Sequence, residues 1–336
     1  MDNIIYTSKK KTTQHESNML LVSKLRIIHL LFLSFSLLML SSCNSDKKIK
    51  KIKQIEGISD NTIMIITEVM DFQTVDTIPS GWNTFKYINN SDETHFFLFD
   101  KYPVGKTIED MEKEVAPTFQ KGMDLINEGK AEEGFAAFNK LPAWFFEVVF
   151  SGGSGLLSPG HASETTINLV PGYYILECYV KMENGKFHST MGMTKPIIVT
   201  ADDSGNKAPD ATVNITLSST DGIILNNPIT KGKQTFAVHF KDQIVHENFV
   251  GHDINLVKLD KNINLETLEK WMNWADPEGL ISPAPQGFIF LGGVNDMPAG
   301  STGYFTLTLE AGNYALISEV PNASSKKMLM SFTVSE

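Results

Sequence analysis

The strongest constraint on the fold of this 336-residue chain is an internal repeat of β-rich segments. Short runs of β-branched and aromatic residues, separated by Gly, Pro and Asn, begin near Thr62, and the same order of segments occurs twice. The matched pairs are residues 78–85 with 229–236, His95 with His252, 108–113 with 265–270, 149–153 with 289–293, and 165–174 with 305–314. Ordered matches of this kind indicate two copies of one domain.

The alternation of apolar and polar residues, with turns between the runs, predicts an all-β chain of two antiparallel β-sandwiches rather than βαβ units. Residues 107–140 interrupt the strands of the first copy with apolar residues at helical spacing, which predicts a helical insertion with a second short helix at 131–139. The second copy has a shorter helical segment at 265–274. We expect the apolar side of the insertion to pack on the sandwich.

Composition and missing motifs exclude several classes of protein. The net charge of -10 argues against nucleic-acid binding, which requires a basic surface. Two cysteines, Cys43 and Cys178, are too few for a disulfide framework or a cysteine-ligated zinc module. The glycine-rich stretch at 150–155 lacks the lysine of a phosphate-binding loop, so we interpret it as a structural turn.

The amino terminus has the pattern of a signal peptide. Residues 27–40 are apolar and follow Lys24 and Arg26. The small residues before Cys43 resemble the lipobox of bacterial lipoproteins, which implies a lipoprotein signal peptide at 1–43 and lipidation of Cys43. An ordinary signal peptide or a short anchor helix is the alternative. We therefore expect a lipoprotein anchored to a membrane of the cell envelope, on the periplasmic or outer-surface side.

The repeat and the composition also suggest domain boundaries. A linker at 44–60 follows the signal peptide, and the first domain is expected at 61–200. A second linker at 201–212 contains three Asp together with Ser, Gly, Asn and Pro, and the second domain is expected at 213–336.

Four potential metal ligands occur in the first copy in the order His95, Cys178, His188 and Met193. A single buried cysteine or loop histidine is usually structural. The complete set is more specific, because thiolate and thioether ligands suit copper(I) while imidazole also accepts copper(II). These four side chains are therefore treated together as candidate metal ligands.

At these residues the chain resembles the cupredoxins, the blue copper β-sandwich family. PGYYILEC (171–178) is similar to the segment that ends at the cysteine in this family. HSTMGM (188–193) is similar to the segment that runs from the family's last histidine to its methionine. The resemblance implies two tandem cupredoxin-like sandwiches, with one copper in the first. It implies that His95 and His188 are imidazole ligands, Cys178 the thiolate and Met193 the weak axial ligand.

The first copy also departs from the family, and the second departs further. Nine residues separate Cys178 from His188, and Phe96 stands where small electron carriers often have Asn. In the second copy Ser318 takes the position of Cys178 and no histidine follows it, so we expect this degenerate domain to bind no metal. We interpret Met328 and Met330 as core residues. We interpret His239, His246 and His252 as surface histidines, with a separate histidine cluster as the alternative.

The expected function is electron transfer or copper handling, with a redox or copper-transfer protein as partner and no nucleic acid. Multicopper oxidases and copper nitrite reductases place a histidine beside the cysteine, whereas the neighbours of Cys178 are Glu177 and Tyr179. We therefore expect no substrate chemistry. Electron transfer requires a partner to approach the ligand end, where Phe187, Met191 and Trp144 are expected at the rim.

Two alternatives remain open at this point. One is transient copper(I) binding through Met191, Met193, His188 and Cys178, without a blue chromophore. The other is a metal-free pair of sandwiches that acts as a binding or interaction module of the cell envelope.

Overall fold

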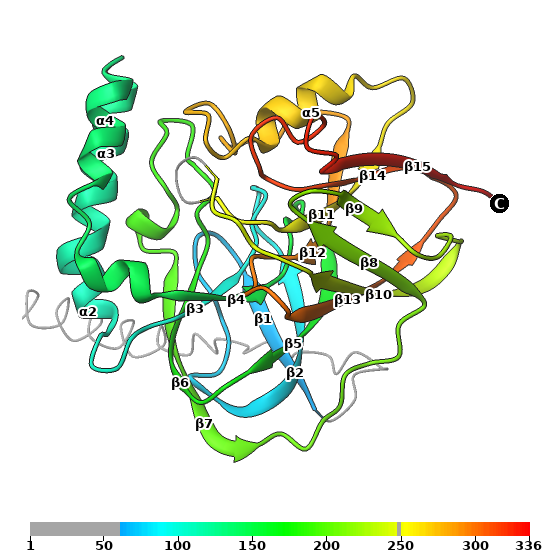
Figure 1. Ribbon diagram of the computed structural model, residues 1–336, viewed down its shortest axis with the longest axis horizontal. Coiled ribbons are helices and arrows are strands. Elements are labelled where there is room, and N and C mark those ends of the chain that lie inside the picture. The colour runs from blue at the N-terminus through cyan, green and yellow to red at the C-terminus, as the bar shows by residue number, and fades with distance from the viewer. Residues whose placement is uncertain (1–60, 247–249) are drawn as a thin grey trace, which may run out of the picture. The chain divides into compact units, whose positions relative to one another are not determined.

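The computed structural model describes residues 61–246 and 250–336, which belong to one compact unit (Figure 1). The expected signal peptide, its lipidation site Cys43 and the linker at 44–60 lie outside the described residues. Within the described ranges, no helix has both the length and the apolar character needed to cross a membrane.

The first copy contains seven strands, with the helices between the third and the fourth. In β2 the buried residues alternate from Asn83 through Phe85 and Tyr87 to Asn89, as a strand with one face in the core requires. The strands are β1 (Thr62–Thr67), β2 (Thr77–Asn89), β3 (Leu98–Lys101), β4 (Val149–Gly153), β5 (Ala162–Leu169), β6 (Gly172–Glu177) and β7 (Thr194–Asp203). The helical segments are α2 (Ile108–Asp110), the π-helical turn Met111–Val115, α3 (Ala116–Asn127), α4 (Ala131–Phe138) and the 3-10 turn Ala143–Glu147.

The described residues of the second copy repeat this order with one additional strand, β9, and with one α-helix, α5. Its elements are β8 (Val213–Ser218), β9 (Gly222–Leu225), β10 (Gly232–Phe240), β11 (Ile254–Leu259), α5 (Leu265–Met272), β12 (Phe288–Val294), β13 (Thr302–Leu309), β14 (Gly312–Ile317) and β15 (Leu329–Val334).

The strand pairings also repeat between the copies. The parallel pair β1–β2 corresponds to the parallel pair β8–β10. The antiparallel pairs β2–β5, β3–β4, β3–β6 and β6–β7 correspond to β10–β13, β11–β12, β11–β14 and β14–β15. Even a cross-strand contact recurs: the hydroxyls of Thr84 and Thr166 lie 2.8 Å apart, and those of Thr235 and Thr306 lie 3.0 Å apart.

These pairings confirm the expected fold class: an all-β chain of two tandem cupredoxin-like sandwiches with a helical insertion in the first. One detail of the expectation was wrong, because the pairs β1–β2, β8–β10 and β2–β7 are parallel. The connection at 68–76 returns the chain to the end of the sandwich where β1 began, so β2 runs in the same direction as β1.

The glycine-rich stretch at 150–155 is not a turn but largely strand β4. A Cβ at Gly153 would overlap the carbonyl group of Phe97 on the neighbouring chain segment. Glycine is needed here because the two backbones approach so closely.

The two copies meet across a local two-fold axis. Strand β5 pairs with β13 so that Thr165 lies opposite Phe305, and these are equivalent positions, since matched residues here differ by 140 (305 − 165). The amide of Gly152 donates to the carbonyl of Asp296 at 2.7 Å, and the equivalent Gly292 donates to Leu156 at 2.8 Å. Reciprocal bonds between equivalent residues are typical of a two-fold interface. The copies are therefore related like the subunits of a symmetric dimer.

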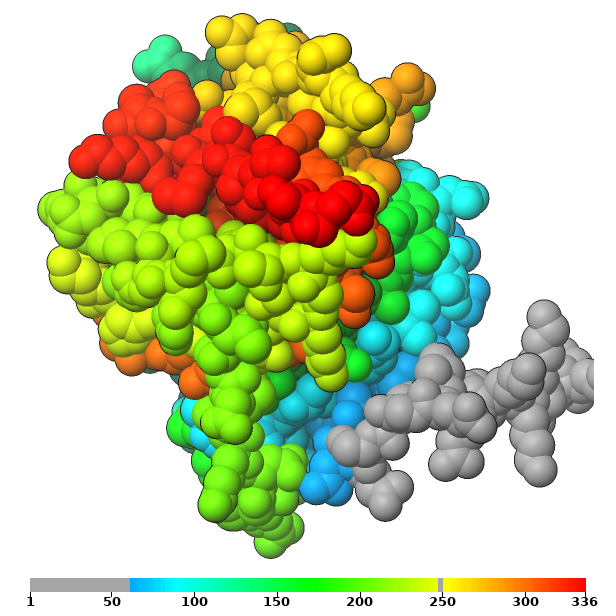
Figure 2. Space-filling model, turned by 90° about the vertical axis from the view of Figure 1, so that its right-hand side faces the viewer, coloured from blue at the N-terminus to red at the C-terminus, as the bar shows by residue number. Residues whose placement is uncertain are grey.

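One sheet and one core run through both copies. The larger sheet has the order β4-β3-β6-β7-β2-β5-β13-β10-β8-β9, with β1 beside β2, and the smaller has the order β12-β11-β14-β15. The rings of Phe236 and Phe305 stack in the shared core, with centroids 4.4 Å apart. In Figure 2 the second copy, coloured yellow-green to red, lies directly against the cyan and blue first copy.

The helical insertion packs on the first sandwich, as expected. Helices α3 and α4 lie side by side at the edge of the first copy (Figure 1). Their buried side chains form a second apolar cluster with Ile175 of β6 and with Phe187. Because Phe187 directly precedes His188, the insertion covers the end of the sandwich that carries the expected ligands. The buried residues of the insertion in this cluster are Met111, Val115, Met123, Ile126 and Phe138.

Candidate metal centre

Three backbone segments bring the expected ligands to one end of the first sandwich. His95 lies just before β3, where its amide donates to the carbonyl of Leu157 at 3.2 Å and its carbonyl accepts from the Leu157 amide at 2.7 Å. Cys178 directly follows β6. His188 precedes the turn Ser189–Met191, and its amide donates to the carbonyl of Val180 at 2.8 Å. Each ligand is therefore fixed at the end of a regular element.

The donor atoms of these three side chains converge. The Sγ atom of Cys178 lies 3.7 Å from Nδ1 of His95 and 3.8 Å from Nδ1 of His188. The two Nδ1 atoms lie 3.1 Å apart. All three side chains are fully buried, and the described residues contain no other convergent group of three His, Cys, Asp or Glu side chains.

The spacing fits one metal ion. Two atoms bound to the same ion lie no more than about 4.6 Å apart when the bonds are about 2.0–2.3 Å long. All three separations lie below that limit. Two imidazoles and one thiolate, with a weak axial methionine, are the donor set of blue copper sites.

Burial controls the protonation of the cluster. Burial, assisted by the neighbouring His188, lowers the pKa of His95 to about 3, and burial lowers the pKa of His188 to about 4. Both imidazoles are thus neutral at pH 7, and each has one ring nitrogen able to bind a metal. Burial raises the pKa of the Cys178 thiol to about 12, so a metal ion must displace the thiol proton.

Glu93 supports the cluster and was not predicted from the sequence. Its Oε2 atom lies 3.1 Å from Nε2 of His188. The two atoms do not form a hydrogen bond. The negative charge of the carboxylate still favours a proton on Nε2, which leaves Nδ1 free to face Cys178 and His95. The Glu93 side chain is 36% exposed, so the site meets solvent here. Its only signal in the sequence is an acidic residue two positions before His95, a pattern too common to be specific.

Met193, the expected axial ligand, is fully buried in the same loop. Its amide donates to the carbonyl of His188 at 2.9 Å, and its carbonyl accepts from the amide of Cys178 at 3.4 Å. These backbone bonds hold Met193 beside both ligands, and its role as a ligand stays a prediction.

The second copy has a hydroxyl where the first has a thiol. Ser318 Oγ donates to Asp253 Oδ1 at 2.7 Å. His252 was wrongly expected on the surface: it is fully buried, because it occupies the interior position that corresponds to His95, and its Nε2 lies 3.2 Å from Nε2 of His246. His239 is exposed, as expected, and contacts the hydroxyl of Thr302.

The two methionines of the second copy belong to its core, as expected. Met328 is buried within it, and Met330 packs against it half-buried.

The rim of the ligand end differs in part from the expectation. Met191 is 48% exposed, but Phe187 is buried, because the segment after α5 of the second copy covers it. The ring of Phe187 stacks on Trp274, with centroids 5.7 Å apart. Trp144 is half-buried and donates to Glu114 Oε2 at 2.8 Å.

No protein-family model and no curated protein matches the chain. Among solved structures it is similar to reduced auracyanin from Roseiflexus castenholzii, with 18% identity over 43% of this chain and 99% of that protein and a TM-score of 0.26. Auracyanin A, a blue copper protein from Chloroflexus aurantiacus, shares 20% identity over 41% of this chain and 98% of its own, with a TM-score of 0.26. A copper-containing nitrite reductase from Thermus scotoductus shares 10% identity over 82% of this chain and 61% of its own, with a TM-score of 0.20.

The repeated strand pairings define a chain of two cupredoxin-like β-sandwich copies. Within that class, this chain brings two histidines and a cysteine together in its first copy, whereas in the second a serine replaces the cysteine.

Proposed function

We propose that the first copy binds one copper ion through His95, Cys178 and His188, with Met193 as the weak axial ligand, and that the protein serves in electron transfer or copper handling. The observation that carries this proposal is the convergence of one sulfur and two Nδ1 atoms in a fully buried position. Such a donor set matches the preferences of copper in both of its common oxidation states.

Copper held by these ligands would take up and release one electron. The chain contributes a rigid and dry environment for that change. The charge of Glu93 lies beside Nε2 of His188, and the backbone bonds of Met193 hold the loop closed around the imidazole. The neighbours of Cys178 are Glu177 and Tyr179, so no histidine beside the thiolate connects the site to a second metal. This favours transfer over substrate chemistry.

A partner is proposed to dock over Glu93 and Met191. Glu93 contacts His188 and is partly exposed, while Met191 lies three residues after His188 and is about half exposed. Together they offer an acidic and an apolar contact at the position where the buried site meets solvent. A redox or copper-transfer protein with a basic rim would fit this surface.

The location in the cell envelope is proposed from the sequence alone. The lipobox-like residues before Cys43 support lipidation and membrane anchoring. Cells that express the protein and are labelled with palmitate should incorporate label into the wild type but not into Cys43→Ala. Labelling of the variant would contradict the anchor.

Copper loading of the full-length, metal-free protein tests the site. We expect one copper per chain and an intense thiolate-to-copper absorption band, both lost in Cys178→Ser. The matched control is Ser318→Ala, the corresponding position of the second copy, which should keep both.

The other outcomes separate the alternatives. Tight copper(I) binding without the coloured band would favour copper handling that includes Met191. No copper uptake under oxidising or reducing conditions, with normal folding of Cys178→Ser, would overturn the copper site in favour of a metal-free interaction module.

A further inference from the structure

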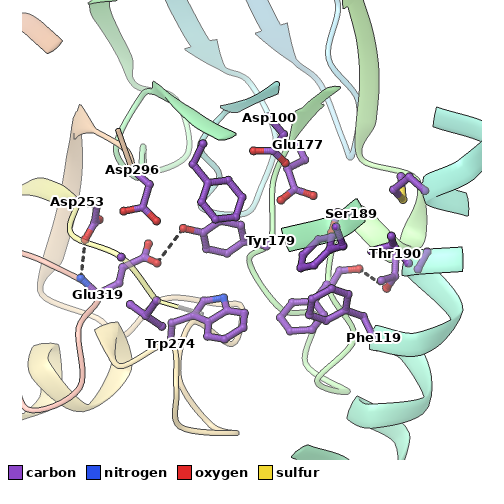
Figure 3. Close-up of a pocket in the computed structure, with 18 of the residues that line it drawn as sticks. Asp100, Phe119, Glu177, Tyr179, Ser189, Thr190, Asp253, Trp274, Asp296 and Glu319 are labelled. Atoms are coloured by element: carbon purple, nitrogen blue, oxygen red, sulfur yellow. Dashed lines mark hydrogen bonds between the residues drawn. The ribbon is translucent and has the colours of Figure 1, made fainter. Parts of the chain in front are cut away.

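A cavity of about 90 Å³ lies where the two copies meet, close to the candidate metal centre. It has several times the space that one water needs. Glu177 and Tyr179 line it from the first copy, on either side of Cys178, and Glu319 lines it from the second. In Figure 3 the acidic side chains Asp253, Asp296 and Glu319 lie on one side, and Phe119 lies on the other.

The acidic wall is buried and incompletely paired. Asp100, Asp253, Asp296 and Glu319 are all buried. Asp253 accepts from Ser318, and Glu319 Oε2 accepts from the Tyr179 hydroxyl at 3.1 Å. Within the described ranges, Asp100 Oδ1 and Glu319 Oε1 have no hydrogen-bond partner. Buried acceptors without partners are costly, so they point to a donor that fills the cavity.

One lysine of the described residues lies near this wall without forming an ion pair with it. Lys181 Nζ donates to the carbonyls of Trp274 and Asp276, at 3.3 and 2.9 Å, and lies 5.7 Å from the ring centroid of Trp274. Its charge acts on Glu319 only from a distance. Burial and mutual repulsion raise the pKa of Asp296 and Glu319 well above the usual range. A bound cation would relieve both the burial cost and the repulsion.

Aromatic side chains also line the cavity: Trp274 lies beside Glu319, and Phe119 lies on the other side (Figure 3). Phe187 stacks on Trp274, and Phe119 meets Phe187 edge to face, with centroids 5.8 Å apart. Aromatic faces bind apolar groups and attract cations. The carboxylates do not converge in threes as the copper ligands do, among the residues described, which disfavours a bare metal ion. The combination fits an organic cation with an apolar body.

We propose that this cavity binds a small organic ammonium ion with an aromatic or alkyl body. The ammonium group lies against Asp253, Asp296 and Glu319 and donates to the free Oε1 of Glu319. The apolar body lies against Phe187, Trp274 and Phe119. Binding at this site does not depend on copper, although the cavity shares a wall with the residues that flank Cys178.

The test uses 2-phenylethylammonium as the probe and 2-phenylethanol as its uncharged counterpart. Titration calorimetry on the full-length protein, with and without copper, measures both affinities. We expect the ammonium to bind at least about tenfold more tightly than the alcohol, since a buried carboxylate without a cation is costly. Equal affinities, or no binding of either probe, would overturn the proposal without affecting the copper site.

Two variants test whether the ammonium probe binds beside Glu319. Glu319→Gln keeps the shape of the side chain and should weaken ammonium binding at least about tenfold, with little effect on the alcohol. The matched control is Glu310→Gln, an exposed glutamate of the second copy, which should leave both affinities unchanged. If Glu319→Gln fails to fold, the affinities of the two probes for the wild type still show whether the cavity prefers the ammonium ion. Displacement of the ammonium by millimolar calcium or manganese would instead indicate a metal site.

Discussion

The hydroxyl of Tyr179 donates to Oε2 of Glu319 at 3.1 Å, and these two residues occupy equivalent positions in the two copies. Tyr179 follows Cys178, and Glu319 follows Ser318, the residue that replaces the cysteine. The bond therefore joins the two copies next to the local two-fold axis. Tyr179 therefore adjoins the proposed ligand Cys178 in the first copy, whereas Glu319 adjoins Ser318 in the second copy, and both Tyr179 and Glu319 line the cavity.

Glu93→Gln should weaken copper binding. The loss of the negative charge beside Nε2 of His188 is expected to lower copper affinity by about 10- to 100-fold, as for other residues that support metal-ligating histidines. Competition with a chromogenic chelator measures the affinity. Asp92→Asn is the control, because Asp92 is exposed and adjacent. Equal affinities of Glu93→Gln and the wild type would show that the contact has no role in binding.

Met193→Leu should keep the coloured band and raise the reduction potential of the copper. Leucine conserves the volume of the buried side chain but removes the weak thioether ligand, which stabilises copper(II). Voltammetry of the copper-loaded protein measures the potential. Met191→Leu, at a half-exposed position, should leave it unchanged. If the potential of Met193→Leu also stays at the wild-type value, Met193 is not a ligand.

The buried carboxyl groups of the cavity should make the protein less stable as the pH rises. Burial raises the pKa of Asp253 to about 6 from its ordinary 3.8, so the folded state holds this proton more tightly than the unfolded state. This proton contributes about 3 kcal/mol to the free energy of unfolding. The contribution is complete below pH 3.8 and is lost as the pH rises through 6. Raised pKa values of Asp296 and Glu319 act in the same direction.

Urea unfolding between pH 4 and 8 measures this dependence. Asp253→Asn should flatten it, while Asp260→Asn, at an exposed position, should leave it as in the wild type. A free energy of unfolding that rises over this range, after the metal has been removed, would contradict the expected sign.

Phe305→Ala should destabilise both copies together. Phe305 is buried on β13, opposite Thr165 of β5, and stacks on Phe236. Loss of this ring is expected to cost about 3–5 kcal/mol. Denaturant unfolding should show one transition shifted to lower concentration, with Thr308→Ala as the exposed control on the same strand. Two separate transitions would mean that the copies unfold independently.

Much of the fold was readable from the sequence because it depends on local patterns. The alternation in β2 and the helical spacing from Ile108 to Ile126 each follow from which face of an element is buried. The match between 149–153 and 289–293 predicted a repeat, and the strand pairings confirmed it. The pairing of β5 with β13 could not be predicted, because a strand pattern does not specify which edge of a sheet remains open.

The candidate site, like the fold, was only partly predictable from the sequence. The sequence by itself determined the donor types and their order, because the choice of thiolate, imidazole and thioether is a matter of ligand chemistry. Only the tertiary structure decided that His95 and His188 face Cys178, that Glu93 supports His188, and that Phe187 lies beneath Trp274. Distances between residues far apart in the chain depend on how strands and loops pack, and no local pattern records that packing.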